Sequence, residues 1–327
     1  MNTIKRIESS ILANPGKKAW EIAKNLRGVN TQMVKGVFDL IEEAEEYASS
    51  TNESSAKREL SNLIVKMRGM EEQIAALTEK KADKTVEIKS PPLFRCGVLS
   101  CTHFGSIYEE VGITKAIYDW FESEGIKNVF HCGDLTEGAN MRKGHEHEIH
   151  KHGADAQIDW TIKQYPYIKG ITTHLISGNH DAVHMRNGGI DVCRRVAEAR
   201  EDINYIGPDY ARFIVHQPGG NDLKIDMIHP DGGCSYSLSY KPQRIIEQLE
   251  HGSSPDLLLI GHFHKAFTLP EYKGVAAVLA GCTQRQTGFM RRNGLAAHVG
   301  AHIIEIRTIE GQKILSTTFR AFYPSQT

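Results

Sequence analysis

Long hydrophobic runs, a large net charge and cysteines in paired spacing are all missing from this 327-residue sequence. No apolar stretch approaches the roughly 18 residues of a membrane-spanning helix, and the N-terminus has early charges without the apolar core of a secretory signal. The formal net charge of −1 gives no overall attraction to nucleic acid or to a membrane surface. Six cysteines without paired spacing favour a reduced, cytoplasmic compartment over a disulfide framework.

What the sequence does contain is a series of five short polar blocks, each directly after an apolar run. The runs are typical of buried strands and cover residues 96–100, 128–132, 172–176, 223–228 and 257–260. The polar residues that follow are Cys101 and His103, then Asp134, then Asn179, His180 and Asp181, then His229, and finally His262 and His264. Strand ends can converge at one edge of an α/β sheet, and these side chains bind divalent transition metals. The series therefore predicts one site for metal ions.

Each of these residues on its own could be purely structural. A single His at a strand end, such as His229, is more often a hydrogen-bonded structural residue than a ligand. Asn179 by itself would be a turn residue, and Asp181 would cap the following helix. Their occurrence in one ordered series favours the metal site. Asp134, which follows a glycine, is the best candidate for the carboxylate that two ions share.

The series resembles the calcineurin-like metallophosphoesterase superfamily, whose pattern runs Asp-x-His, Gly-Asp, Gly-Asn-His-Asp/Glu, His and Gly-His-x-His. The sequence follows this order between about residues 98 and 265, with one departure, because Cys101 stands where the family has Asp. The resemblance implies one metal held by Cys101, His103, Asp134 and His264. It implies a second metal held by Asp134, Asn179, His229 and His262.

The catalytic roles also come from the resemblance. A hydroxide between the two metals would attack the phosphoester, His180 would protonate the leaving oxygen or stabilise the charged phosphorane, and Asp181 would orient His180. The ions would be Mn, Zn or Fe. If Cys101 is a ligand, its thiolate favours Zn or Fe; if it is only a small buried residue, the first site is weak or empty.

Two loops are candidates for substrate contact. The segment 144–152 holds four histidines, of which His150 and His152 are nearest the following helix, and the alternative is a solvated polar loop. The segment 281–294 is rich in glycine and carries Arg285 and Arg291, whose guanidinium groups suit phosphate oxygens. A flexible surface turn is the alternative for this segment.

The first 50 residues resemble a helix-turn-helix module. Apolar periodicity predicts three short helices, and residues 1–36 hold seven Lys or Arg against two Glu, a net charge of +5. If the third helix enters a major groove, Thr31, Gln32 and Lys35 would face the bases. The alternative is a small protein-docking bundle. Such an arm on a small hydrolase would suit a bacterium or a phage.

Residues 51–90 read as a helical linker. Apolar residues between 60 and 77 repeat with spacings of three and four, which predicts a coiled coil and a homodimer. Packing of this stripe against the catalytic domain is the alternative.

The remaining residues, 91–327, form the predicted catalytic domain. Helical stretches at 109–124, 154–165, 189–200 and 241–251 alternate with strands, and further strands follow at 275–279, 302–308 and 313–322. This order predicts an α/β fold, which agrees with the β-sandwich flanked by helices that the resemblance implies. We expect a dinuclear metal-dependent phosphodiesterase or nuclease acting on nucleic acid. The alternatives are a phosphoesterase of nucleotides or cyclic nucleotides, and an inactive metal- or DNA-binding homologue.

Overall fold

The structure is a computed structural model that describes Ser10 and residues 17–24, 34–35, 85–219, 222–250 and 252–323. The chain divides into two compact units, Met1–Asp83 and Lys84–Thr327. In the part of the chain that is described, no helix is long and apolar enough to cross a bilayer.

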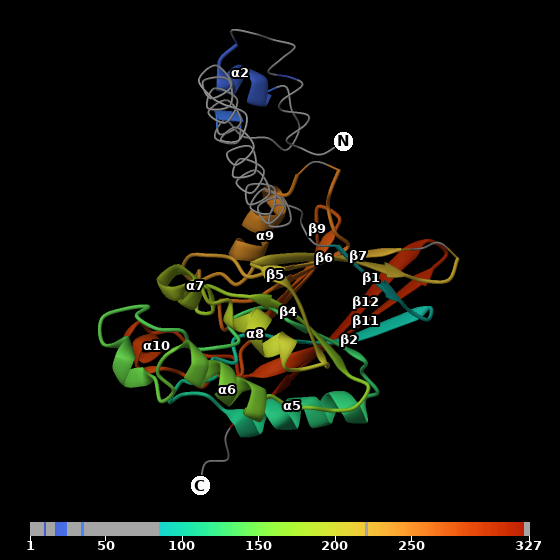
Figure 1. Ribbon diagram of the computed structural model, residues 1–327. Coiled ribbons are helices and arrows are strands. Elements are labelled where there is room, and N and C mark those ends of the chain that lie inside the picture. Colours follow the sequence, from blue (N-terminus) through green and yellow to red (C-terminus); the bar gives the residue numbers. More distant parts are fainter. Residues whose placement is uncertain are drawn as a thin grey trace, which may run out of the picture. The chain divides into compact units, whose positions relative to one another are not determined.

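The larger unit is built on two six-stranded sheets (Figure 1). The first sheet has the order β1-β6-β7-β8-β10-β9. Its strands are β1 (Thr85–Lys89), β6 (Tyr210–His216), β7 (Leu223–Ile228), β8 (Leu257–Ile260), β10 (Val275–Ala280) and β9 (Ala266–Tyr272). The second sheet has the order β12-β11-β2-β3-β4-β5. Its strands are β12 (Gln312–Ala321), β11 (Gly300–Ile309), β2 (Leu93–Leu99), β3 (Asn128–His131), β4 (Thr172–Ser177) and β5 (Ile203–Pro208).

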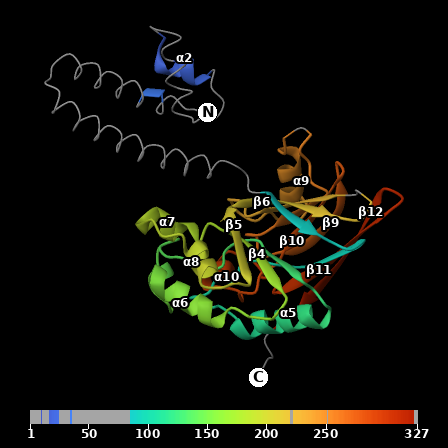
Figure 2. The same cartoon turned by 45° about the vertical axis from the view of Figure 1, so that its right-hand side comes forward.

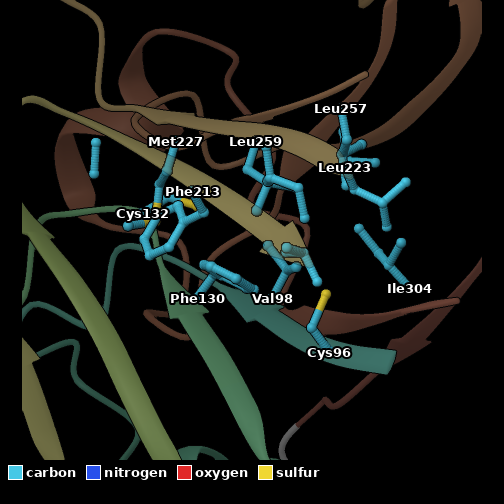
Figure 3. Packing of buried hydrophobic residues seen from close by; sticks show 14 of the residues in the cluster. Cys96, Val98, Phe130, Cys132, Phe213, Leu223, Met227, Leu257, Leu259 and Ile304 are labelled. Carbon is cyan, nitrogen blue, oxygen red and sulfur yellow. The ribbon is translucent and has the colours of Figure 1, made fainter. Parts of the chain in front are cut away.

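The two sheets pack face to face over an apolar core (Figure 3). Side chains alternate between the two faces of a strand, so that Phe94, Cys96 and Val98 of β2 enter this core from the second sheet. Leu257 and Leu259 of β8 enter it from the first sheet. These five side chains are at most 2% exposed, which fixes the pairing of the two sheets and hence the relative position of their strand ends.

Helices cover the outer faces of both sheets, on opposite sides of the sandwich (Figures 1 and 2). The second sheet is covered by α5 (Val111–Ser123), α6 (Ala154–Gln164) and α8 (Val192–Glu198), with α7 (Ala182–Gly188) before α8. The first sheet is covered by α9 (Tyr240–Glu247). Two short helices, η1 (His145–Glu148) and α10 (Gly288–Arg292), lie in loops. This is the predicted α/β sandwich flanked by helices, and the fold class is confirmed.

Close helix packing on the second sheet depends on a glycine in β2. A Cβ atom at Gly97 would lie 2.7 Å from the ring of Phe121 on α5. Phe121 is fully buried, so its ring could not move aside without loss of packing. The glycine therefore allows α5 to lie directly on the strand that leads to Cys101.

The boundary of the predicted linker needs one correction. Residues 85–89, which were expected to belong to the linker, form β1 and pair in parallel with β6 of the first sheet. The strand has a single buried residue, Ile88, so the sequence gives only a weak signal for it. The predicted coiled coil at residues 60–77 lies outside the described residues.

Little of the N-terminal unit is described. Helix α2 (Ala19–Lys24) lies in the stretch from Ala19 to Leu26, whose apolar spacing predicts the second of the three helices, and it buries Ile22. Lys35 is exposed in a helical segment next to the buried Val34. Thr31 and Gln32, the other two residues expected to face bases, lie outside the described residues.

Candidate metal centre

The predicted ligands come from the carboxyl ends of strands in both sheets. Cys101 and His103 follow β2, Asp134 follows β3 and Asn179 follows β4, and these three strands run in parallel in the second sheet. His229 follows β7, and both His262 and His264 follow β8, which runs parallel to β7 in the first sheet. The seven residues therefore gather at the edge where the two sheets meet.

Cys101, His103 and His264 form the first group of donors, called here the Cys101 set. Their ligand atoms all lie within 4.8 Å of one another. The Nε2 atoms of His103 and His264 are 3.1 Å apart. Cys101 and His103 are at most 2% exposed, whereas His264 is partly buried.

Asn179, His229 and His262 form the second group, called here the Asn179 set. The Oδ1 atom of Asn179 lies 3.1 Å from Nε2 of His229 and 3.0 Å from Nδ1 of His262. Asn179 belongs to the second sheet and the two histidines to the first, so this group joins the two sheets.

Asp134 lies between the two sets. Its Oδ2 atom is 3.1 Å from Nε2 of His229 in the Asn179 set and 3.7 Å from Nε2 of His103 in the Cys101 set. Its Oδ1 atom accepts a hydrogen bond of 2.9 Å from the backbone N–H of His180, which fixes the carboxylate. The carboxylate is 1% exposed. One oxygen of Asp134 is therefore placed to serve both sets.

The donor atoms fit metal ions in spacing and in tautomer. Ligand bonds of about 2.0–2.3 Å place neighbouring ligands roughly 3–3.7 Å apart. The separations of 3.0–3.1 Å between His103 and His264 and from Asn179 to its two histidines lie in this range. The carbonyl oxygens of Cys132 and Gly232 can only accept, so Nδ1 of His229 and Nε2 of His262, each 2.6 Å away, carry the hydrogens. The opposite nitrogen of each ring, the one that faces Asn179, is then free to bind a metal.

The backbone at this edge is strained. Cys101, His103, Asp134, His262 and His264 all have positive φ, between 50° and 76°. A left-handed conformation costs a residue other than glycine about 1 kcal/mol or more, and such strain clusters at functional sites. Five of the seven predicted ligands have this left-handed conformation, which indicates that the local backbone orients their side chains toward the site.

Gly178 is required by the same crowding. A Cβ atom at this position would lie 2.5 Å from the backbone nitrogen of Asp134 and 2.8 Å from Cε1 of His229. Any side chain would therefore push Asp134 away from the Asn179 set. Strand β4 ends at Ser177, and Gly178 connects it to Asn179 in close contact with Asp134.

Burial and neighbouring charges set the protonation of these groups. Burial favours the neutral acid of Asp134, but His229 and His180 outweigh it and hold the pKa of Asp134 well below its ordinary value. Burial, and then the charge of Asp134, raises the pKa of the Cys101 thiol well above its ordinary value. Burial likewise lowers the pKa of His262 and His264. Asp134 is therefore the permanent negative charge of the site, and a metal ion must displace the proton of Cys101 to be bound by it.

His180 is placed beside the donors, but the predicted role of Asp181 needs correction. The Nδ1 atom of His180 lies 2.6 Å from the backbone carbonyl oxygen of Glu137, which orients the ring. Asp181 instead accepts hydrogen bonds from the backbone N–H groups of Leu135, Thr136 and Gly178, at 2.7–3.1 Å. Its side chain makes no capping bond to α7. Asp181 thus holds together the loops that carry Asp134 and Asn179, and does not orient the His180 ring.

The four residues predicted to contact substrate lie elsewhere. His150 lies 2.9 Å from Glu109 Oε1, and His152 is exposed. Arg285 donates to the carbonyl oxygen of Ile107 at 2.7 Å, and Arg291 is exposed on α10. None of the four lines the cavity over the metal ligands. The structure therefore does not bring these four residues to the metal ligands, and their contact with substrate stays a prediction. Glu109 holds the side chain of His150, and the carbonyl oxygen of Ile107 holds that of Arg285.

That cavity has a volume of about 290 Å³ and combines a polar floor with an apolar wall. The floor is formed by His103, Asp134, Glu137, His180, His262 and His264, and the wall by Phe263, Phe289, Met290 and Leu295. Arg142 also lines it, with its guanidinium carbon 4.8 Å from the ring centroid of Phe289 and an ion pair to Glu148. Of the two predicted loops, only segment 281–294 contributes to the cavity, through residues such as Phe289 and Met290, whereas Arg142 lies two residues before the His-rich segment.

Sequence reasoning missed three further residues at the site: Glu137, His145 and Gln284. Glu137 is 1% exposed and lies against His103 and His145. Gln284 donates to Glu137 at 3.1 Å although the two are 147 positions apart in the chain. The sequence offers two signals for this cluster: Glu137 stands three residues after Asp134, and His145 belongs to the His-rich segment 144–152.

A family model for the calcineurin-like phosphoesterase superfamily domain matches residues 94–298. The chain belongs to the calcineurin-like phosphoesterase superfamily. The match confirms the resemblance that the five blocks predict. The family binds divalent metals, and the described residues of this calcineurin-like phosphoesterase include the His, Asp and Cys groups that could hold them.

Solved structures of similar fold are remote in sequence. A predicted phosphoesterase from Streptococcus pneumoniae TIGR4 is 14% identical with a TM-score of 0.34, and the match covers 69% of this chain and 98% of that one. Vacuolar protein sorting 29 from Cryptosporidium parvum is 11% identical with a TM-score of 0.35, covering 70% and 99%. Vps29 from Entamoeba histolytica, complexed with Zn²⁺, is 12% identical with a TM-score of 0.30, covering 69% and 99%. Similarity at this level transfers no function. Among curated proteins, no match was found.

Proposed function

We propose that this calcineurin-like phosphoesterase is a dinuclear metal-dependent phosphodiesterase that cleaves nucleic acid. The observation that carries the dinuclear part is the position of Asp134, whose Oδ2 atom is 3.1 Å from the Asn179 set and 3.7 Å from the Cys101 set. When bound, two ions would lower the pKa of a water and neutralise charge on phosphoryl oxygens.

In this proposal His180 handles the proton of the leaving group. The carbonyl oxygen of Glu137 accepts the hydrogen on Nδ1, so proton transfer at the cavity takes place at Nε2. To donate from Nε2, the ring must carry both hydrogens, and the same carbonyl stabilises that cation. The ring centroid lies 4.5 Å from that of His103, which places His180 directly beside the Cys101 set.

The cavity supports a substrate that has both an anionic and an apolar part. A phosphodiester group would lie against the metal ligands, and Arg142 adds a guanidinium group at the wall. A nucleobase would pack against Phe289, which is 39% exposed, and against Met290 and Leu295 beside it. A nucleotide unit combines these features.

Charge near the N-terminus supports a polymeric nucleic acid as the substrate. Seven Lys or Arg stand against two Glu in residues 1–36, although the whole chain has a net charge of −1. Lys17, Lys18, Lys24 and Lys35 are all exposed. Exposed lysines bind phosphates without reading sequence, so this segment would supply affinity rather than specificity.

The decisive assay compares three substrates in the presence of Mn²⁺, Zn²⁺ or Fe²⁺: methyl p-nitrophenyl phosphate, thymidine 5′-(p-nitrophenyl phosphate) and labelled single-stranded DNA. The proposal predicts hydrolysis of all three and none in the presence of a chelator. In F289A, kcat/KM for the thymidine diester should fall about tenfold, while that for the methyl diester, which has no base, should be unchanged. No hydrolysis of any diester with any of the metals would contradict the proposal and favour the inactive binding homologue.

A phosphoesterase of free nucleotides or cyclic nucleotides is the second candidate. The cavity volume of about 290 Å³ favours it, because pockets for small ligands begin near this size. This candidate predicts that the unit from Lys84 onward retains full activity on the thymidine diester and that labelled DNA is a poor substrate. Efficient cleavage of DNA that depends on the N-terminal unit would exclude it.

A further inference from the structure

Glu137 is a buried carboxylate beside the metal ligands to which the proposed reaction assigns no side-chain role. It lies three residues after Asp134, is 1% exposed, and its backbone N–H donates to Phe104 O at 3.0 Å. Burial favours its neutral acid, but hydrogen-bonding contacts with His103 and His145 outweigh that effect and keep the pKa of this carboxyl group below its ordinary value. A fixed backbone and an ionised side chain make Glu137 a permanent feature of the centre.

Both carboxylate oxygens have defined partners. Nδ1 of His145 accepts from the backbone N–H of Met141 at 3.3 Å, so Nε2 carries the hydrogen and donates it to Oε1 of Glu137 at 2.7 Å. Oε2 accepts from Nε2 of Gln284 at 3.1 Å and lies 3.0 Å from Nδ1 of His103. That nitrogen is buried and has no aligned hydrogen-bond partner among the described residues.

Among the residues that the structure describes, no lysine or arginine pairs with the charge of Glu137. Within the described ranges, its ion-pair partners are both histidines, His103 and His145. An ionised carboxylate in a buried position is costly unless a positive charge or several hydrogen bonds offset it. A metal ion held by His103 would supply that positive charge through the imidazole ring.

We propose that Glu137 is a positioning residue whose Oε2 atom, 3.0 Å from Nδ1 of His103, accepts the hydrogen of that nitrogen after a small rotation of the ring and so fixes Nε2 as the metal-binding nitrogen. That Nε2 atom lies 3.1 Å from Nε2 of His264 and 3.7 Å from Oδ2 of Asp134, at the centre of the Cys101 set. Carboxylates paired in this way with metal-binding histidines orient the ring and raise its basicity. The inference rests on the metal centre of the proposed function but not on its substrate.

A second role for Glu137 would be only to hold loops together. His145 belongs to the segment next to Arg142, and Gln284 precedes α10, which carries Phe289, so the carboxylate also joins two walls of the cavity. A loop-holding role predicts that loss of either contact weakens the site equally. A positioning role predicts that only the contact with His103 affects metal binding.

The test compares E137Q with H145Q in the full-length protein, using Co²⁺ as the probe. E137Q replaces the carboxylate by an amide that has only one accepting oxygen. H145Q replaces the imidazole donor to Glu137 by an amide but keeps the carboxylate facing His103. Affinity for Co²⁺, measured by competition with a chelator, should fall 10- to 100-fold in E137Q and change less than about twofold in H145Q. The visible absorption spectrum of bound Co²⁺ should shift in E137Q only.

A second measurement, by NMR, detects the Nδ1 hydrogen of His103 directly. In Zn²⁺-loaded protein with labelled histidine, the Nδ1–H proton signal of His103 should be present in the wild type and in H145Q and absent or shifted in E137Q. Equal Co²⁺ affinity and an unchanged His103 signal in E137Q would overturn the inference, and so would equal losses in both variants. If E137Q does not fold, E137D, which withdraws the carboxylate by one methylene, must still weaken Co²⁺ binding. An unchanged affinity in E137D would equally overturn it. Failure of the wild type to bind Co²⁺ would contradict the proposed function instead.

Discussion

The backbone carbonyl oxygen of Glu137 lies 2.6 Å from Nδ1 of His180, so a main-chain group orients this ring. A side-chain substitution cannot remove a backbone carbonyl group, so the role of the ring is tested by replacing His180 itself. In H180A we expect kcat for cleavage of single-stranded DNA, whose alkoxide leaving group needs a proton, to fall by about 10²–10⁴, the usual contribution of general acid catalysis. The metal content should remain that of the wild type, because His180 belongs to neither donor set.

The control for this prediction is a substrate with a leaving group that needs no proton. For the p-nitrophenolate leaving group the loss should be smaller than for an alkoxide leaving group such as that in DNA. A variant that loses metal together with activity would show that His180 is a ligand and that its role is misassigned.

Cys101 is the next test, because it departs from the family pattern. The thiol is fully buried and within 4.8 Å of the donor atoms of His103 and His264. If it ligates, C101D should shift the metal preference of the Cys101 set from Zn²⁺ or Fe²⁺ toward Mn²⁺, measured as the ratio of activities with each metal. C96A, which removes another buried sulfur from the preceding strand, is the matched control and should leave the ratio unchanged. An identical ratio in C101D and the wild type would mean that Cys101 only fills space.

The basic N-terminal segment predicts salt-dependent binding. Replacing the exposed Lys17, Lys18, Lys24 and Lys35 with alanine should weaken binding to single-stranded DNA and reduce the slope of log K against log salt by up to about 3. Activity on methyl p-nitrophenyl phosphate should not change, because these lysines belong to the other compact unit. Fluorescence titrations at several salt concentrations measure the slope. An unchanged slope would favour the protein-docking alternative for this segment.

The positions of many strands in the catalytic domain could be predicted from the sequence, because an apolar run bounded by glycine or polar residues directly indicates a buried strand. The strands expected at 223–228 and 257–260 have those bounds in the structure. Strand β9 was not predicted, since most of its residues are only partly buried and it contains Pro270. Edge strands of this kind bury too little to leave a pattern.

The candidate site was predictable where a residue follows a strand and not where a loop places it. Asp134, Asn179 and His229 each follow a strand that could be recognised, and the structure brings them together. Gln284 and Glu137 meet only because two loops from distant parts of the chain fold over the same edge. Local sequence carries no signal for such a contact.

Buried histidines outside the site predict how stability depends on pH. His302 is 2% exposed, its Nε2 atom donates to the carbonyl oxygen of Leu279 at 3.1 Å, and burial lowers its pKa to about 4. The unfolded chain takes up a proton near pH 6.5 and the folded protein does not, so stability is present above that pH and is lost as the pH falls toward 4. Between pH 7 and 5 the loss should be on the order of 1–2 kcal/mol from this residue.

H302Q keeps a side-chain donor but cannot titrate, so its free energy of unfolding should fall less than that of the wild type over the same range. Urea unfolding at pH 7 and pH 5, with a chelator in all samples, isolates the difference. Equal losses of unfolding free energy in both proteins would mean that His302 takes up its proton as readily in the folded state as in the unfolded chain.

The central claim is that one carboxylate, Asp134, holds two metal ions together, and counting the ions tests it most directly. Anomalous diffraction and elemental analysis of metal-loaded protein should give two ions per chain on either side of Asp134 in the wild type. In D134N, which cannot supply the negative charge, at most one weakly held ion should remain, and diester hydrolysis should be lost. A single ion in the wild type, or two ions retained in D134N, would contradict the account.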